Sequence, residues 1–383
     1  MDFSWPTEYL DYRREVEAFV VAELNPLIRD ADATGEFPRE AWRKAADFGI
    51  QALAAAASDG GPFPEVAFSR ALLAMEGFGY ASADGGLPFA LNAQMWTVQM
   101  PLAAFGSEEQ KERYLRPMVR GEMVGCHALT EPDAGSDVMS MQLRAERVDG
   151  GYVLNGKKRL ITLGPVADVV LLFANARPEL GRWGISAFLV EAGTEGFTRP
   201  PRNRKMGLRG VPLGELHFTD CFLPESARVG GEGAGFGILN HSLEYDRCAI
   251  LAAQLGAMER QLEQSVAFVK TRKQYGQSVG SFQSVSNRIA DMKLRLETSR
   301  LLLYKTAWLK ESGQSALLEA ALLKLQLSEA FVSSSFDAIR NLGGSGYLTE
   351  FGAERDLRDA LGGVLYAGTS DIQRNIIAKL LGL

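Results

Sequence analysis

The first third of the chain carries the apolar spacing of helices. From residue 8 to about residue 119, apolar side chains recur three and four positions apart, interrupted by prolines such as Pro26 and by short glycine-containing loops. This period favours amphipathic or buried helices. Ser107 stands three residues before Gln110, and such a pair can satisfy two backbone N–H groups where a helix begins. We therefore predict an N-terminal helical domain over residues 1–121.

The next stretch has a period of two. Met141, Leu143 and Ala145 alternate with polar residues, as in a strand that is buried on one face only. Asp149-Gly150 follows, a dipeptide that favours a tight hairpin turn. Further apolar runs of strand length continue beyond it. We predict a β domain over residues 122–232, built as a sandwich or a barrel.

A glycine-rich segment, Gly230–Gly235, separates this domain from the last part of the chain. Beyond it the spacing is again helical, and the apolar run from Leu317 to Leu327 leaves almost no polar face. A helix of that kind is buried in a bundle or at a subunit contact. We predict a C-terminal four-helix bundle over residues 233–383, so the fold class is α+β with three domains. The predicted helical segments are residues 236–270, 281–311, 315–341 and 369–381.

The composition excludes several classes of protein. With 46% hydrophobic and 23% charged residues the chain is typical of a globular protein, and its net charge of −6 argues against nucleic acid as a partner. The three cysteines lack CxxC spacing and the three histidines are scattered, so we expect no metal site. The first residues lack the apolar core of a signal peptide, and no apolar run reaches ~18 residues. We expect a cytoplasmic protein without a membrane partner.

The loop from Leu129 to Asp137 has candidate binding chemistry. It combines hydroxyl groups with small residues that leave backbone N–H groups accessible, which suits a polar planar ligand. From these residues alone, an ordinary polar turn at the entrance of a β domain is an equally good interpretation. Two other glycine-containing segments do not bind nucleotides by known motifs. Lys158 replaces the Ser or Thr that a P-loop requires, and Gly230–Gly237 lacks G-x-G-x-x-G spacing.

Three separated motifs resemble those of the acyl-CoA dehydrogenase family of flavoenzymes. They are Thr130–Asp137, Arg272–Gly276 with Gln283, and Tyr366–Thr369 extended to Arg374. Together they span most of the chain, in the order found in that family. The resemblance implies FAD as the cofactor and α,β-dehydrogenation of an acyl thioester. It also implies a homotetramer or dimer of dimers, and an electron acceptor that is either electron-transfer flavoprotein or oxygen.

The resemblance further implies which residues contact the cofactor. Arg272 suits a pyrophosphate because a guanidinium group donates two parallel hydrogen bonds to phosphate. Arg272, Gln283 and Arg340 are expected to reach the cofactor from a neighbouring subunit. Leu160, His127 and Arg340 depart from the residues that are usual in the family, so their individual contacts differ. The implied cofactor-binding residues are His127, Leu129, Thr130, Ser136, Leu160, Thr162, Arg272, Tyr275, Gln283, Arg340, Gly344, Thr369 and Asp371.

The catalytic base requires a separate argument. Most members of the family carry glutamate directly before the C-terminal Gly-Thr, but this chain has Ala367, which cannot accept a proton. Some members instead place the base before an arginine on the first helix of the C-terminal domain. That pair is Asp246-Arg247 here, and we predict Asp246 as the base, with Arg247 and Ser136 contacting the substrate. Glu244 is the second candidate, and a solvated surface charge pair is the alternative without catalysis.

One part of the family is more similar to this chain than the rest. Asn155–Lys158, Phe282–Arg288 and Asp291–Leu296 resemble segments of dehydrogenases that act on acyl groups tethered to carrier proteins, the prolyl type in particular. The resemblance implies a substrate on a phosphopantetheine arm, in secondary metabolism. An acidic carrier needs a basic surface, although a solvated loop is the more common role of such charges. The candidate basic residues are Arg199, Arg202, Arg204, Lys205 and Arg209.

Four alternatives remain open at this point. The substrate is either a carrier-bound acyl group or a short or branched acyl-CoA. The same fold also suits a flavoprotein oxidase or monooxygenase, in which the reduced flavin reacts with oxygen. Ala367 motivates a third class of function, a catalytically silent subunit that binds FAD and supports an active partner.

Overall fold

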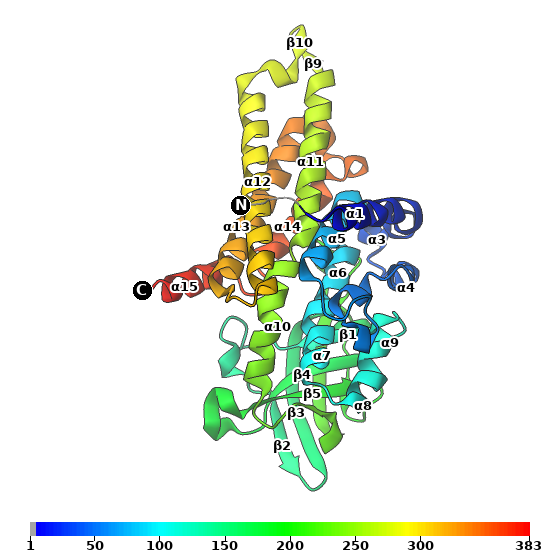
Figure 1. The fold of residues 1–383 in the computed structure, drawn as a ribbon, viewed down its shortest axis with the longest axis vertical. Helices are drawn as coiled ribbons and strands as arrows, with labels where there is room; N and C mark the ends of the chain where they lie inside the picture. The colour runs from blue at the N-terminus through cyan, green and yellow to red at the C-terminus, as the bar shows by residue number, and fades with distance from the viewer. Residues whose placement is uncertain (1–4) are drawn as a thin grey trace.

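The computed structural model describes residues 5–383, and its regions are arranged along one long axis (Figure 1). A bundle of long helices forms one end, and a β-sheet of eight strands forms the other. The N-terminal helices lie beside the junction of the two. The α+β architecture with a helical bundle that was expected from the sequence is confirmed.

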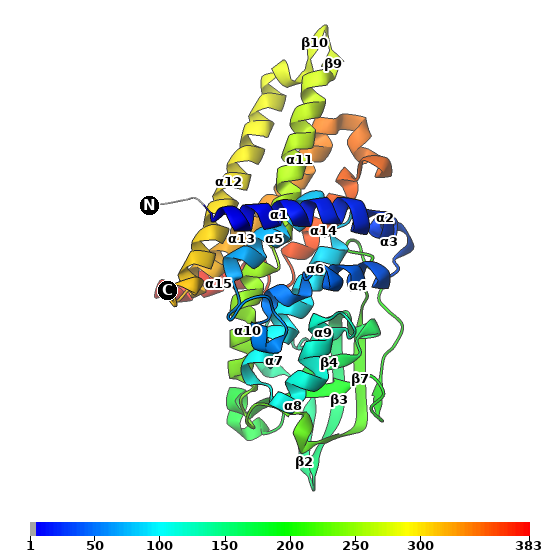
Figure 2. The ribbon, with the colours of Figure 1, turned by 45° about the vertical axis from the view of Figure 1, so that its right-hand side comes forward.

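The N-terminal region is helical, as its apolar spacing predicts. Its helices are α1 (Thr7–Phe19), α2 (Asn25–Ile28), α3 (Ala31–Thr34), α4 (Arg39–Asp47), α5 (Phe68–Ala81), α6 (Gly86–Gln94), α7 (Met100–Phe105), α8 (Glu108–Gln110) and α9 (Arg116–Val119). The predicted capping box is present, because Gln110 N donates to Ser107 Oγ and Ser107 N donates to Gln110 Oε1, both at 3.1 Å. Helix α5 is buried along most of its length, and α1 lies across it (Figure 2).

The N-terminal helices contain three π-helical turns, called wide turns here, and each lies shortly before a proline. A proline has no N–H to donate and its ring displaces the carbonyl four residues earlier, so the hydrogen bonds shift to the longer π-helical spacing. The expectation that Pro26 interrupts the first helix is therefore wrong, because the helical path continues from α1 into α2. The wide turns are Val20–Leu24, Met95–Gln99 and Lys111–Leu115, followed two residues later by Pro26, Pro101 and Pro117.

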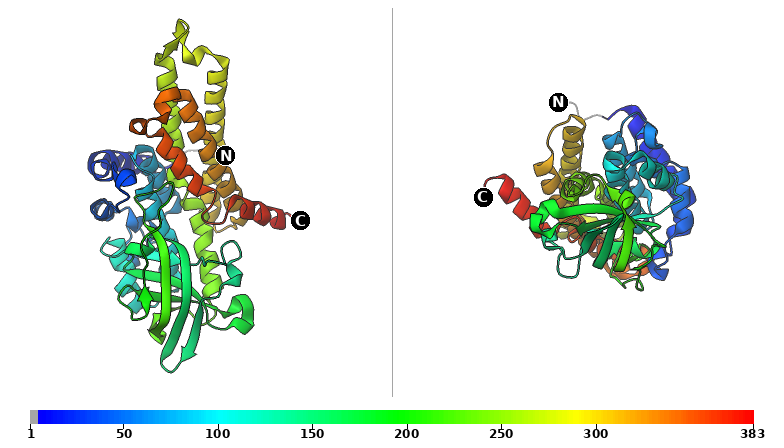
Figure 3. Two further views of the ribbon diagram at one scale, coloured as in Figure 1. Left: turned by 180° about the vertical axis from the view of Figure 1, so that it is seen from behind. Right: turned by 90° about the horizontal axis from the view of Figure 1, so that it is seen from below.

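The β region is a mixed sheet. Its strands are β1 (Gly125–Ala128), β2 (Arg144–Val148), β3 (Gly151–Thr162), β4 (Val169–Asn175), β5 (Ile185–Glu191), β6 (Phe197–Thr198), β7 (Leu213–Pro224) and β8 (Arg228–Val229). They run in the order β6-β7-β3-β2-β4-β5-β8, and β1 pairs in parallel with β4. The predicted Asp149-Gly150 turn joins β2 to β3, with Gly150 at φ +77°. The N-terminal helices cover one side of the sheet (Figure 3).

The C-terminal region contains the longest helices. They are α10 (Gly235–Ala249), α11 (Ala252–Thr271), α12 (Gln283–Glu311), α13 (Leu317–Leu342), α14 (Ala353–Gly363) and α15 (Ser370–Leu380). Two short strands, β9 (Lys273–Gln274) and β10 (Gln277–Ser278), connect α11 to α12 at the far tip of the bundle (Figure 1). As its apolar sequence predicts, α13 packs inside the bundle, against α11, α12, α14 and α15.

Two features of this region differ from the sequence-based prediction. The segment predicted as one helix over residues 236–270 is interrupted at Ile250–Leu251, so that α10 lies beside the sheet while α11 runs into the bundle. Helix α14 was not predicted. Within residues 5–383 no helix is long and apolar enough to cross a membrane.

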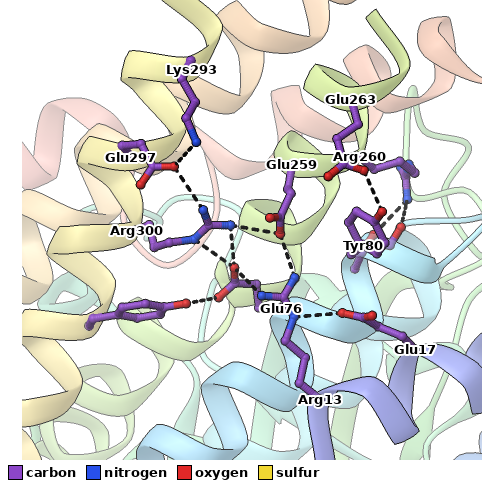
Figure 4. Close-up of polar contacts among 12 residues, drawn as sticks. Arg13, Glu17, Glu76, Tyr80, Glu259, Arg260, Glu263, Lys293, Glu297 and Arg300 are labelled. Atoms are coloured by element: carbon purple, nitrogen blue, oxygen red, sulfur yellow. Dashed lines mark hydrogen bonds and ion pairs between the residues drawn. The ribbon is translucent and has the colours of Figure 1, made fainter. Parts of the chain in front are cut away.

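A buried ionic network centred on Glu76 joins the N-terminal helices to the bundle (Figure 4). The Glu76 carboxylate on α5 accepts hydrogen bonds from Arg300 at 2.8 and 3.1 Å, from the Tyr304 hydroxyl at 2.8 Å and from Arg13 at 3.3 Å. Glu259 of α11 binds the same two arginines, at 2.7 Å from Arg13 and 2.9 Å from Arg300. Because every charge in the network has an opposite partner, the cost of burying Glu76 is offset.

We expect Glu76→Gln to lower the free energy of unfolding by about 3 kcal/mol, because two partly buried guanidinium groups lose the more deeply buried of the two carboxylates that they share. Urea denaturation measures this change. Glu263→Gln is the matched control, since Glu263 accepts one exposed hydrogen bond from Tyr80 and an exposed pair contributes less than ~1 kcal/mol. Equal effects of the two substitutions would contradict the central role of Glu76.

Candidate active site

An interior ion pair organises the loop from Leu129 to Asp137. Lys158 of β3 is fully buried, and its Nζ donates to Glu131 Oε1 and to the Leu129 carbonyl, both at 2.8 Å. The Glu131 carboxylate also accepts from the backbone N–H groups of Gln142 at 2.6 Å and Leu143 at 3.1 Å. Glu131 is therefore committed to holding the loop against β3.

The loop brings several of the predicted cofactor residues together. Arg159 N donates to the Thr130 carbonyl at 2.8 Å, so Leu129 and Thr130 lie next to the end of β3, which carries Leu160 and Thr162. Leu160 has φ +58° and an exposed side chain at an irregularity in the pairing of β3 with β7. Ser136 is exposed in the same loop.

His127 provides a buried polar atom at this place. It lies on β1, with its ring centroid 5.0 Å from that of Phe173, and its Nε2 has no hydrogen-bond partner in the part of the chain that the structure describes. Burial, assisted by the charge of Lys158, lowers the pKa of His127 to about 4. The imidazole is therefore neutral at pH 7 and can donate or accept a single hydrogen bond from each nitrogen.

Asp246 is a buried carboxylate of a different kind. It lies on α10 with 5% exposure, and its side chain makes no hydrogen bond or ion pair with any of residues 5–383. Burial raises the pKa of Asp246 to about 7, although the cations Arg247 and Lys324 act in the opposite direction. Glu244 is instead held by Lys310 Nζ at 2.8 Å. Of the two candidate bases, only Asp246 has a carboxylate without a partner.

Arg247 and Lys324 are the two cations that lower the pKa of Asp246. Burial lowers the pKa of both, and Arg247 Nε and Lys324 Nζ lack hydrogen-bond partners among the described residues. Lys324 is fully buried on α13 and was not singled out from the sequence. The available signal was a lone lysine within an apolar run of a helix predicted to be buried.

The C-terminal motif forms a tight turn before α15. Ala367 has φ +54° and Gly368 has φ +85°, and Gln373 Nε2 donates to both of their carbonyls, at 3.2 and 3.0 Å. Thr369 Oγ1 accepts from Ile372 N at 3.2 Å and so caps α15. Asp371 is exposed and pairs with Arg374 in the first turn of that helix. A helix N-terminus with this cap favours an anionic group nearby.

The remaining predicted cofactor residues lie far from the loop and β3. Arg272, Tyr275 and Gln283 are at the tip of the α11–α12 arm, at the opposite end of the molecule from the sheet (Figure 1), and Tyr275 is 94% exposed. Arg340 is exposed and paired with Asp337 at 3.4 Å, and Gly344 is exposed just after α13. One chain by itself therefore does not bring these residues to the cluster at His127.

The candidate basic cluster of the β region is mostly used inside the chain. Arg199 donates to the Ala167 carbonyl at 2.7 Å, and Arg202 pairs with Glu36 at 2.8 Å. Lys205 is half-buried and donates to the Gly207 carbonyl at 3.0 Å. The charged groups of these three residues thus bind other parts of the same chain. This favours an ordinary loop of the β region over a surface that docks a carrier protein.

Three models of known protein domains match successive parts of the chain. Residues 6–122, 126–221 and 233–382 match the N-terminal, middle and C-terminal domains of acyl-CoA dehydrogenase. The chain belongs to the acyl-CoA dehydrogenase family. This membership confirms the enzyme class expected from the sequence, an FAD-dependent oxidoreductase.

Three individual proteins of this family are similar to the chain over nearly its full length. An L-prolyl-[peptidyl-carrier protein] dehydrogenase of Serratia sp. (strain ATCC 39006) is 39% identical over 383 residues, which is 100% of this chain and 99% of that protein. The crystal structure of the prolyl acyl carrier protein oxidase AnaB has a TM-score of 0.96 and 43% identity, covering 99% of this chain and 100% of that one. A structure of PigA with FAD and proline has a TM-score of 0.97 and 39% identity, and each chain is covered completely.

Lys324→Met tests whether Lys324 acts on Asp246. The folded-state pKa of Asp246 lies above its ordinary value, so its ionisation costs stability as the pH rises from 3.8 to about 7. Removing a cation that favours the carboxylate should extend this loss about one pH unit higher. We expect this shift in urea denaturation measured from pH 4 to pH 9.

The original chain and each Lys324 variant are measured with and without the further substitution Asp246→Asn. The difference between the two free energies of unfolding at each pH is the contribution of Asp246. Lys324→Arg keeps the positive charge and should leave the curve near that of the original chain. The same Asp246-dependent curve in Lys324→Met and the original chain would show that Lys324 does not influence Asp246.

Proposed function

We propose that this chain binds FAD and dehydrogenates a small acyl group, held as a thioester on a carrier protein, with Asp246 as the base. The observation that carries the proposal is a buried carboxylate without a partner whose pKa is close to neutral. A base with such a pKa is ionised often enough to accept a proton and still basic enough to remove one. The similarity to prolyl-carrier dehydrogenases supports the carrier-bound substrate.

The residues of the chain fit FAD. The neutral His127 ring has a buried nitrogen without a partner, and the adjoining loop offers the hydroxyl and backbone groups of Thr130. Thr162 at the end of β3 adds a further hydroxyl. The capped N-terminus of α15, with Thr369, presents N–H groups that suit phosphate oxygens. We propose that these residues hold the flavin ring and part of the pyrophosphate.

The chain's own residues then perform defined tasks in the reaction. FAD, when bound, supplies the acceptor for the hydrogen that leaves the β carbon of the acyl group. Asp246 removes the α proton, and its burial keeps water from competing for the carboxylate. Lys324 and Arg247 favour the charged form of Asp246 before the proton is taken. Ala367 contributes no acid, so the base comes from elsewhere in the chain.

We further propose that a second subunit completes the site. Arg272, Gln283 and Arg340 are exposed, and the first two lie at the tip of an arm far from the sheet of their own chain. Leu294, Leu301 and Trp308 on α12 are 63%, 52% and 58% exposed, and their spacing of seven residues places them on one face of that helix. This face suits the contact of a dimer of dimers. The site then lies where the proposed domains 1–121, 122–232 and 233–383 meet.

An oxidase is the second candidate, because a relative of known structure at 43% identity is described as an oxidase. The same reduction of FAD by the substrate precedes both outcomes. Stopped-flow mixing of the reduced protein with oxygen distinguishes the two functions. The reduced flavin of an oxidase is reoxidised rapidly by oxygen, whereas that of a dehydrogenase is reoxidised rapidly only by electron-transfer flavoprotein. A chain whose FAD no acyl thioester reduces would instead be a silent subunit.

Asp246→Asn should keep bound yellow FAD but slow its bleaching by a substrate thioester by about 10³-fold, because the general base is lost. In the original chain the bleaching rate should rise as the pH passes through about 7, since only the carboxylate accepts the proton. Anaerobic stopped-flow absorbance measures both effects. Glu244→Gln, at an acid already paired with Lys310, is the control and should bleach normally. Rapid bleaching in Asp246→Asn would disprove the assignment.

Arg272→Ala should weaken FAD binding by about 10- to 100-fold, the contribution expected of a charge-assisted hydrogen bond to phosphate. Titration of the apoprotein with FAD, followed by flavin fluorescence, measures the affinity. Lys273→Ala removes a neighbouring charge of the same arm and is the matched control. Unchanged affinity in Arg272→Ala would remove the arm from the proposed site.

A further inference from the structure

Two buried carboxylates border one small cavity where the three regions of the chain meet. Asp84 lies between α5 and α6 and is 2% exposed, and Asp359 lies on α14 and is 4% exposed. Both line a cavity of about 30 Å³, which Leu208 of the β region also lines. A water molecule needs ~10–15 Å³ by this measure, so the cavity has room for about two waters.

Each of the two carboxylates has one bound oxygen and one free oxygen. Asp84 Oδ1 accepts from Gly86 N at 2.9 Å, and Asp359 Oδ1 accepts from Leu208 N at 2.5 Å. The Oδ2 atom of each has no hydrogen-bond partner in the described part of the chain. A Cβ atom on Gly85, the residue after Asp84, would lie 2.9 Å from Asp359 Oδ2. The segment that carries Asp84 thus packs directly against the free oxygen of Asp359.

The cations beside the cavity bind other groups. The titratable groups that face the pair from the surrounding elements are Asp32, Lys205, Arg260, Arg355, Asp356 and Tyr366. Arg260 donates to Asp356 at 3.0 Å and to three backbone carbonyls. Lys205, on the loop that carries Leu208, also donates to backbone carbonyls. Within the described residues, neither of these cations donates a hydrogen bond to Asp84 or Asp359.

The surroundings favour a proton on one of the two acids. Burial raises the pKa of Asp359, and the charge of Asp84 raises it further. Burial also raises the pKa of Asp84, against the opposing effect of Arg355. Two carboxyl groups in one buried site do not both ionise at low cost, so one of them keeps its proton. A protonated carboxyl group can donate to the free oxygen of its neighbour, directly or through a water.

We propose that Asp84 and Asp359 share one proton across the cavity, and that this proton fastens α14 to the N-terminal helices and to the β region. With the proton in place, the two free oxygens are joined by hydrogen bonds. Its loss leaves two buried negative charges on facing elements, which repel each other. The cohesion of the three regions therefore depends on pH. This inference is independent of the proposed function, because neither acid is among the residues proposed to bind FAD or substrate.

Infrared spectra of the purified full chain, recorded from pH 4 to pH 9, report protonated carboxyl groups. Every protein in the set also carries Asp246→Asn, so that the proposed base does not contribute. We expect one carboxyl group to stay protonated above pH 5. Asp84→Asn and Asp359→Asn should each abolish its band completely, because the amide donates in place of the shared proton and the remaining acid ionises. A band that each single variant removes only by half would show two independent protons and would overturn the inference.

Urea denaturation of the same set tests the link to stability. A group whose pKa is raised in the folded state stabilises the fold below its ordinary pKa of ~4, and this contribution is lost as the pH rises through the folded-state pKa. One extra proton on the folded chain makes the unfolding equilibrium constant rise about tenfold per pH unit. Each single Asn variant should lower this dependence as far as the double variant does, and comparison within the set removes the contribution of Lys205.

Asp356→Asn is the matched control, because Asp356 lines the same cavity but already pairs with Arg260 at 3.0 Å. It should keep both the infrared band and the tenfold dependence. Circular dichroism establishes that each variant is folded. If folded Asp84→Asn and Asp359→Asn kept the pH dependence of their parent, the shared proton would not fasten α14. Absence of the band in the parent would overturn the inference without any substitution at the pair.

Discussion

The ion pair between Lys158 and Glu131 is the interaction on which the candidate site depends. Taking two charges out of water costs several kcal/mol per ion, and only good geometry with further hydrogen bonds offsets that cost. Here the ammonium also reaches the Leu129 carbonyl, and the carboxylate also accepts two backbone N–H groups. The pair therefore fixes both ends of a loop whose own residues are small and polar. Without it, the backbone hydrogen bond from Arg159 N to the Thr130 carbonyl would have to hold the loop against β3 with little side-chain support.

Three buried acids of this chain, Glu76, Glu131 and Asp246, differ in how their charges are satisfied. Glu76 and Glu131 each have at least three hydrogen-bond donors, so their charges are satisfied and unavailable. Asp246 is equally buried but has no donor within the described chain. Burial raises the pKa of Asp246 to about 7, against the opposing effect of Arg247 and Lys324. Such an acid is costly for the fold, and the proposed role of Asp246 as the base gives that cost a function.

Much of the fold and part of the site could be predicted from the sequence, because local signals determine them. The capping box at Ser107, the hairpin at Gly150 and the apolar α13 follow from spacing and turn chemistry alone. The loop before Asp137 could be located but not interpreted until separated motifs supported it. Asp246 was found through its neighbour Arg247, and the structure adds that its carboxylate has no partner.

Other features depend on contacts between residues far apart in the chain, which spacing does not reveal. The break at Ile250–Leu251 contains neither proline nor glycine, so the surrounding packing determines it. Lys324 matters through its charge on another helix, and Phe89 meets Tyr366 across more than half of the chain. The continuous path through Pro26 was missed for a related reason, because a wide turn can absorb a proline that would otherwise end a helix.

The projecting arm that carries Arg272 has a thermodynamic consequence. If cofactor contacts come from two subunits, the binding of FAD and the association of subunits are coupled equilibria of the same chain. Whatever factor association adds to the affinity for FAD, FAD adds to the affinity between subunits. Occupancy of the flavin site then depends on protein concentration, and dilution empties the site and separates the subunits in one coupled process. Under the proposed assembly, the arm would make redox competence a property of the associated subunits and not of one chain.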